Sequence, residues 1–378
     1  MFIPDVLPDE VSALRDATAG LFQKYASEED LRQVITTGSY DRELWSRMAA
    51  MGLHGLGIPE ELGGVGGGPV ESFVAFREAG RVLLSSPFFA SVGLAANLLA
   101  EACERDAQEH YLPLIASGSM VGTVAMSEGQ GSWNPADVVT TVETDGRLSG
   151  IKTHVPDAAN ADVLLVVARH RAGIGVFAVD PHAEGAEVAP LTTLDLTRPM
   201  ADVRFDRAAA VRLSGSRDQS AEVTAAVHAA ALALTAEQLG GAESVMQASL
   251  DYARTRVQFG RTIGSFQAIK HKLADMAFDL ERMTSAGWHA ARSAAGATAD
   301  QAIAIHVAQA FCSEAYFRLA AENIQIHGGI GFTWEHPAHL YFRRAKASEV
   351  LCGNSQFHRD SLFKLLVHTA LSPAASIP

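Results

Sequence analysis

Residues 254–267 read RTRVQFGRTIGSFQ, and residues 325–334 read QIHGGIGFTW. The first stretch places two guanidiniums, an amide and an aromatic ring at the predicted end of a long helix, just before Gly260. The second places an amide three residues before two adjacent glycines, which allow a backbone to approach a bulky charged ligand closely. Arginine recognises phosphates through paired hydrogen bonds, and glycine-rich backbone offers amide donors to an anion. Together the two stretches predict a site for the pyrophosphate of a dinucleotide.

The composition narrows the class of protein. A chain of 378 residues can bury a large core and is expected to form two or three domains. Its net charge of −13 argues against nucleic acid or an anionic membrane surface as the main partner, because both attract clustered positive charge. No stretch approaches about 18 uncharged apolar residues, and no secretory signal is recognised. The 3 cysteines are widely separated, which suits reduced thiols in the cytoplasm and predicts neither disulfides nor a metal cluster.

The hydrophobic pattern divides the chain into three parts. Residues 1–119 carry apolar side chains at three- and four-residue intervals, the spacing of one helix face. Residues 120–212 contain short β-rich runs separated by turn signals, which predicts a small β-sandwich or barrel. Residues 213–378 are helical again and alanine-rich, which predicts a four-helix bundle. The predicted fold class is therefore α+β, with a helical domain, a β domain and a bundle in that order.

Individual elements are predicted within this frame. Asp41 is expected to cap a helix over 43–51 that ends at Gly52. The predicted strands are 121–125, 138–142, 148–153, 163–167, 175–179 and 203–205. The predicted bundle helices lie near 219–257, 266–293, 298–326 and 336–367.

The two opening stretches, with further motifs in order along almost the whole chain, resemble the acyl-CoA dehydrogenase family. Residues 58–66, IPEELGGVG, resemble its P-E-x-x-G-G loop, and residues 127–132, SEGQGS, resemble its T-E-P-x-x-G-S-D flavin loop. The resemblance implies removal of two hydrogens from the α and β carbons of an acyl-CoA thioester. A carboxylate takes the α proton, and FAD accepts the β hydride at N5. It also implies an oligomer in which FAD lies between the β domain of one subunit and the C-terminal helices of its neighbour.

The resemblance assigns cofactor-binding residues by motif match. The pyrophosphate and adenosine half of a neighbour's FAD is assigned to Arg256, Gln258, Phe259, Gln325, Gly328 and Gly329. Met126 and Ser127 are assigned to the flavin ring. Their loop lacks the usual Pro and Asp, and residues 152–156, KTHVP, stand where the family has an aromatic residue followed by a hydroxyl residue. Ring binding by this chain's own β domain therefore stays open, with His154 interpreted either as a flavin-stacking residue or as a surface strand residue.

The largest departure from the family is at the catalytic base. The family's E-G-T-x-Q is CGNSQ here, over residues 352–356. Asn354, which mimics the threonine, and Gln356 are assigned to the cofactor, but Cys352 occupies the position of the glutamate. A thiol with a pKa of about 8.5 is a poor base at neutral pH, and buried cysteine commonly serves as a small hydrophobe, so Cys352 is predicted to be structural. The family's other base position, 29 residues before Phe259, is Ala230. No catalytic residue is assigned.

Three hypotheses follow. The first is the base-lacking subunit of a heteromeric acyl-CoA dehydrogenase, a heterotetramer built as a dimer of dimers with a base-bearing homologue. It resembles bacterial two-subunit enzymes that act on CoA thioesters of steroid or other bulky side chains. The second is a self-sufficient homo-oligomer with an unconventional base, and the third is a non-catalytic scaffold that has lost FAD. Family analogy adds an electron-transferring flavoprotein as acceptor. An acyl pocket is expected between helices of the first and third parts, with the alanine-rich run 221–236 leaving room for a wide acyl group.

Overall fold

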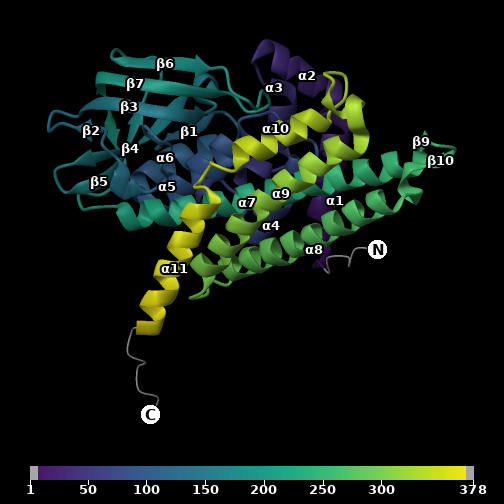
Figure 1. Cartoon of the computed structure of the whole chain (residues 1–378). Coiled ribbons are helices and arrows are strands. Elements are labelled where there is room, and N and C mark those ends of the chain that lie inside the picture. Colours follow the sequence, from purple (N-terminus) through teal and green to yellow (C-terminus); the bar gives the residue numbers. More distant parts are fainter. Residues whose placement is uncertain (1–6, 372–378) are drawn as a thin grey trace.

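The fold is described over residues 7–371 by a computed structural model, with side chains described to residue 367. A helical N-terminal region, a curled sheet and long C-terminal helices follow one another, as Figure 1 shows. The predicted α+β class is confirmed. The sheet lies at one end of the molecule, and the β9–β10 hairpin lies at the other (Figure 1). The three domain ranges stay a prediction. Within the described residues, no helix is both long and apolar enough to cross a membrane.

Helices form the N-terminal region, and one of their predicted ends is confirmed in detail. The Asp41 side chain accepts hydrogen bonds from the backbone N–H groups of Glu43 at 2.7 Å and Leu44 at 3.1 Å. Gly52, with φ of 81°, adopts the left-handed conformation that follows the helix. The elements are α1 (Asp9–Tyr25), α2 (Glu28–Thr37), α3 (Arg42–Ala50), α4 (Pro69–Arg81), a π-helix (Phe89–Ala96), α5 (Asn97–Ala102) and α6 (Arg105–Ala116).

One mixed eight-stranded sheet follows. Its order is β6-β7-β3-β2-β4-β5-β8, and β1 pairs with β4 in parallel. The strands are β1 (Gly122–Ala125), β2 (Thr141–Val142), β3 (Arg147–Pro156), β4 (Val163–His170), β5 (Gly173–Val179), β6 (Ala186–Leu191), β7 (Met200–Ala209) and β8 (Val211–Arg212). The predicted strand 138–142 is wrong except at its last two residues. The backbone N–H groups of Val139 and Thr140 donate to the Glu128 carboxylate instead of to a neighbouring strand.

Strand β4 joins two cores. Val163, Leu165 and Val167 pack into the main core with the helices, whereas Leu164 and Val166 face a smaller core inside the curled sheet. Successive side chains of a strand point to opposite faces, so a strand buried on both faces needs a continuous apolar run. This double burial anchors the sheet to the helices and holds the loops at its edge in place.

Long helices form the C-terminal region: α7 (Ser220–Thr255), α8 (Gln267–Ala295), α9 (Gln301–His327), α10 (Ala338–Ser348) and α11 (Ser355–Leu371). The predicted helix 336–367 is wrong, because the chain leaves the helix after α10. Cys352, with φ of 56°, and Gly353, with φ of 100°, are both left-handed, and the Asn354 side chain accepts from the Phe357 N–H at 2.8 Å to begin α11. The position of the family's base therefore lies on a turn between two helices.

Backbone contact between α4 and α7 places a buried carboxylate. A β-carbon at Gly80 would overlap the carbonyl oxygen of Glu237, and one at Gly240 would overlap that of Arg77. Two glycines thus allow the helices to cross without intervening side chains. The crossing carries Glu237 into the interior, where its side chain is buried.

A buried histidine pair docks α11 on α9. The Nδ1 atoms of His306 and His358 lie 2.8 Å apart, and the ring of His228 on α7 lies 4.7 Å from that of His306. One Nδ1 must donate and the other must accept, so the two rings cannot both be protonated at Nδ1. Burial lowers the pKa of His306 to about 3 and that of His358 to about 4.

We expect the free energy of unfolding to fall as the pH is lowered from 7 to 5. In the unfolded chain these histidines bind protons near pH 6.5, whereas in the folded chain they stay neutral to about pH 4. The unfolded state therefore gains protons first, and each histidine removes roughly 1.4 kcal/mol per pH unit within that window. Urea denaturation between pH 5 and 7 measures the slope. It should decrease in His358→Gln and stay unchanged in a His110→Gln control, which alters an exposed side chain. Equal slopes in all three proteins would contradict the assignment.

Candidate functional site

A cavity of about 570 Å³ lies between the sheet and the segment that joins α10 to α11. Four separate segments supply its polar lining: the loop after β1, strand β3, the loop between β6 and β7, and the turn before α11. The polar residues that matter below are Ser127, His154, Asp195, Arg198 and Asn354. A pocket in which a few polar groups converge from distant segments is the expected form of a small-molecule site.

The loop after β1 presents a hydroxyl group without a protein partner. Ser127 is buried, and within the described residues its Oγ makes no hydrogen bond. The loop is held by Lys152, which is fully buried and donates to Glu128 at 2.5 Å and to the Met126 carbonyl oxygen at 3.1 Å. A buried hydroxyl is costly without a partner, so this rigid position fits a ligand edge that completes the hydrogen bond. Sequence reasoning missed the Lys152–Glu128 pair, although both residues lie inside the quoted motifs.

His154 is turned into the cavity by an irregularity in β3. The pairing of β3 with β7 shifts register between Lys152 and Val155, and His154 has φ of 55°. The backbone N–H of His154 donates to the Asp202 carboxylate at 3.0 Å. Bulges commonly redirect a side chain at a functional site. His154 is exposed and lies on the cavity wall, so its position fits both interpretations.

Beneath the cavity, four charged side chains form a buried network. Arg344 is 2% exposed and donates to Asp195 at 2.7 Å and to Glu237 at 2.9 Å. Arg198 donates to both oxygens of Glu237 at 2.5 Å. Burial alone would raise the pKa of Glu237, but Arg198 and Arg344 hold that pKa below its ordinary value. Sequence reasoning missed this network, because its members come from three segments and pair only after folding.

Among the described residues that line the cavity, no carboxylate is free to accept a proton. Asp195 is the single acidic residue in the lining, and it accepts hydrogen bonds from Arg344 and Thr197. Cys352 is 0% exposed and lies behind the lining, where burial raises the pKa of its thiol far above the ordinary value. A thiol that stays protonated cannot serve as a general base at neutral pH.

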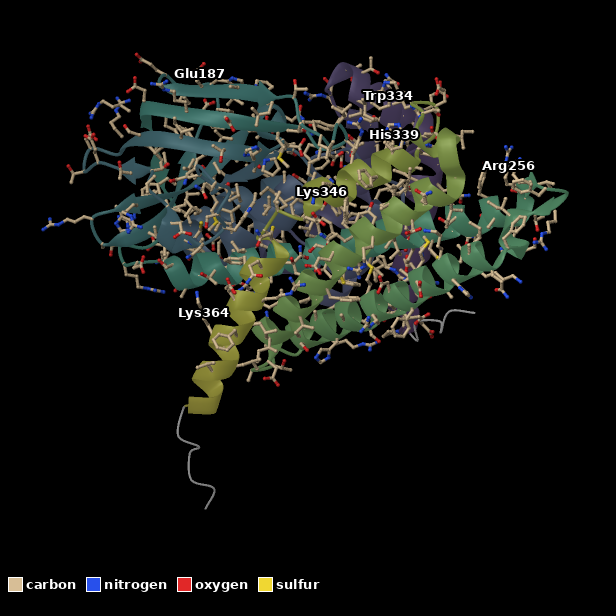
Figure 2. All side chains as sticks on the ribbon, viewed as in Figure 1. Glu187, Arg256, Trp334, His339, Lys346 and Lys364 are labelled. Atoms are coloured by element: carbon tan, nitrogen blue, oxygen red, sulfur yellow. The ribbon has the colours of Figure 1, made fainter. Side chains whose placement is uncertain are left out.

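The residues predicted to bind a dinucleotide lie together at the hairpin end of the molecule. Arg256 follows α7, Gln258 lies in β9 (Val257–Gln258), which pairs with β10 (Arg261–Thr262), and Phe259 at the hairpin tip is 91% exposed. Tyr252 of α7 stacks on His327 at the end of α9, with ring centroids 4.3 Å apart, and this contact brings the two motif stretches together. Figure 2 shows Arg256 at the end of the molecule away from Glu187 of β6. We call this group the clasp; its members are Arg256, Gln258, Phe259, Gln325, Gly328 and Gly329.

The clasp is open for a ligand. Gln325 is exposed, and β-carbons at Gly328 or Gly329 would meet no atom within 4 Å. Gly328, with φ of 66°, uses the left-handed conformation that glycine adopts without strain. An exposed arginine, exposed amides and accessible glycine backbone are the donors that a pyrophosphate requires.

The predicted site residues therefore fall into two groups that one chain does not bring together. Ser127 and Asn354 line the main cavity, and Met126 lines an adjoining hollow of about 360 Å³. Gln356 lies outside both linings and donates to Asp360 at 2.8 Å. The unpartnered hydroxyl of Ser127 fits a flavin edge, and the clasp fits the pyrophosphate, so the residues present fit FAD.

Comparisons with known proteins agree with this arrangement. Residues 8–119 match the acyl-CoA dehydrogenase N-terminal domain, and residues 221–366 match the acyl-CoA dehydrogenase C-terminal domain. The chain is 33% identical to acyl-CoA dehydrogenase IpdE2 of Mycobacterium tuberculosis, over 91% of this chain and 93% of that protein.

Two solved structures of multi-subunit enzymes are also similar. A variant of the Tcur3481–Tcur3483 steroid acyl-CoA dehydrogenase has 31% identity and a TM-score of 0.88, with 96% of this chain and 99% of that chain covered. The ChsE4–ChsE5 complex from Mycobacterium tuberculosis has 30% identity and a TM-score of 0.87, covering 98% of this chain and 100% of that chain. With fold, site and sequence in agreement, this chain belongs to the acyl-CoA dehydrogenase family, whose members are oxidoreductases that act on acyl-CoA and use FAD.

Proposed function

We propose that this chain is the base-lacking subunit of a heteromeric acyl-CoA dehydrogenase and completes the FAD site of a homologous partner. One observation carries the proposal: the clasp lies open at the hairpin end of the molecule, away from the sheet that lines the cavity, and the described residues of that lining include no free carboxylate. Because the clasp lies away from the cavity of its own chain, it binds the cofactor of a neighbouring subunit. The enclosed thiol of Cys352 leaves proton abstraction to that neighbour.

Each group of residues has a role in this proposal. Bound FAD supplies the hydride acceptor for the oxidation of an acyl-CoA thioester. Arg256, Gln258 and the Gly328–Gly329 backbone bind the pyrophosphate and orient the cofactor toward the partner. Phe259 of the clasp, together with Phe332 and Trp334, which follow the clasp glycines in the sequence, are exposed aromatic side chains that favour association with another protein surface.

The wider assignment follows the relatives. We propose a dimer of dimers with a base-bearing homologue, a bulky or ring-bearing acyl-CoA as substrate, and an electron-transferring flavoprotein as electron acceptor. The three free cysteines fit the reducing cytoplasm.

Reconstitution tests the proposal. The full chain is purified alone and together with its base-bearing homologue from the native host, and flavin content and acyl-CoA oxidation with an artificial acceptor are measured. We expect little flavin and negligible oxidation for the chain alone, and both should return with the partner. Cys352→Ala should leave the activity of the complex unchanged. Robust turnover by the chain alone would instead establish a self-sufficient enzyme, and absence of flavin from every preparation would establish a scaffold.

A further inference from the structure

One residue of the main cavity's lining also contacts the helical interior. Arg198 is 6% exposed and lines the cavity floor. Directly behind it lie the Phe89 ring, whose centroid is 4.7 Å from the guanidinium carbon, and the Glu237 carboxylate at 2.5 Å. Neither Phe89 nor Glu237 lines the cavity. Arg198 therefore separates the open space on its sheet side from a close-packed interior.

The acyl pocket was expected between helices of the first and third parts of the chain, and Arg198 contacts Phe89 from the first part and Glu237 from the third. Phe89 begins the π-helix Phe89–Ala96, whose residues are all buried and which packs against both β1 and α7. Ala226, Ala230, Ala231, Ala233 and Ala236 of α7 are buried as well. Among the described residues, neither the N-terminal helices nor α7 contribute to the lining of the main cavity. The run 221–236 therefore contributes nothing to the described lining of the main cavity, and the expectation that it leaves room for a wide acyl group stays a prediction.

Arg198 is fixed in this position by its partners. Both oxygens of Glu237 accept from it, and Glu237 is itself held by Arg344, which also bonds Asp195. Two ions removed from water depend on each other, because either alone would be a buried unpaired charge. The Phe89 ring adds a cation–π contact on the guanidinium face. A side chain with these constraints does not swing aside as an exposed arginine would.

We propose that Arg198 is a plug that closes this chain's own acyl path. It ends the cavity at the guanidinium and keeps ligands out of the packed region between the π-helix, α7 and Cys352. The chain's cavity then admits a short or flat ligand and excludes a long or wide acyl group. The inference rests on the proposed function in one respect: a subunit that leaves proton abstraction to its partner needs no acyl path of its own.

Cys352 reports whether the plug is closed, because it is fully buried, lies between the lining residues Leu351 and Asn354 in the sequence, and is close enough to Arg198 for the guanidinium to lower the pKa of its thiol against the effect of burial. The full chain, without partner or flavin, is treated with N-ethylmaleimide, and the labelling rate of each cysteine is followed by peptide mass spectrometry. Two matched variants are compared with the unmodified chain. Arg198→Ala with Glu237→Gln removes the bulk of the plug, whereas Arg198→Met with Glu237→Gln removes the same charges and keeps the bulk. Cys312, buried between α8 and α9, is the internal reference.

We expect Cys352 labelling to rise at least 10-fold in the alanine variant only, with Cys312 unchanged in all proteins. Calorimetry of the same chains with dodecanoyl-CoA should detect binding to the alanine variant and none to the methionine variant. If the double alanine variant does not fold, the single variant Arg198→Ala replaces it, because Glu237 then still pairs with Arg344. An unchanged labelling rate of Cys352 in the alanine variant would overturn the proposal. An equal rise in the Cys352 rate in the methionine variant, or an equal rise in the Cys312 rate, would also overturn it. None of these readouts requires a partner or turnover, so they are independent of the reconstitution result.

Discussion

Replacing Arg344 with methionine is expected to lower the free energy of unfolding by about 3–5 kcal/mol, the cost typical of breaking a buried ion pair from one side. Arg344 is 2% exposed and bonds Asp195, Glu237 and Thr197 at once. Methionine has a similar length, so the main loss is charge and not volume. Asp195 would lose its cationic partner, and Glu237 would keep only Arg198.

Urea denaturation at pH 7 measures this loss. The adjacent Arg343 provides the control, since its side chain is less buried and, among the described residues, it donates a hydrogen bond only to the Leu194 carbonyl oxygen at 3.1 Å. Arg343→Met should cost less than about 1 kcal/mol. Arg344→Lys should restore only part of the stability, because an ammonium cannot reproduce the fork of bonds that a guanidinium makes. Equal losses at positions 343 and 344 would show that the network contributes little.

Replacing Arg256 with alanine is expected to weaken FAD binding by the assembled complex roughly 10- to 100-fold, the effect of losing about 1.5–3 kcal/mol of hydrogen bonding to a charged group. Arg256 is exposed at the end of α7, and none of the ion pairs described for residues 7–371 involves it. The substitution should therefore leave the stability of the chain itself within about 0.5 kcal/mol of the unmodified value.

Equilibrium dialysis of FAD against the complex measures the affinity. Arg254→Ala is the matched control, because Arg254 is an exposed arginine only two residues away and lies 3.6 Å from Asp251. It should change FAD affinity less than threefold. If both alanine variants bind FAD equally weakly, the effect is one of general positive charge at the helix end and Arg256 is not a specific pyrophosphate ligand.

The order of neighbouring residues was enough to predict the elements whose structure depends on local interactions. The Asp41 cap needed only the two backbone N–H groups that follow it, and the alanine-rich composition was enough to predict the long helices α7, α8 and α9. The clasp was recognised for the same reason: within each of its two stretches, the essential residues lie a few positions apart.

Contacts between distant segments decided the rest. The helix predicted over 336–367 ends because the turn at Cys352 and Gly353 takes left-handed conformations that helical propensity does not anticipate. The strand predicted from Val138 is lost because the Glu128 carboxylate takes the backbone N–H groups that a ladder would have used. In both cases tertiary partners outweighed local preference.

The same distinction between local pattern and distant contacts applies to the candidate site. The order of motifs along the chain was sufficient to establish the family, the FAD-binding residues to test and the absence of the usual glutamate at position 352. Only the folded chain placed the clasp away from the sheet that lines the cavity and brought Arg198, Glu237 and Arg344 together beside that cavity. Ion pairs between residues far apart in sequence leave no local signal, because their energy comes from burial and exact partners that exist only once the helices and the sheet have packed.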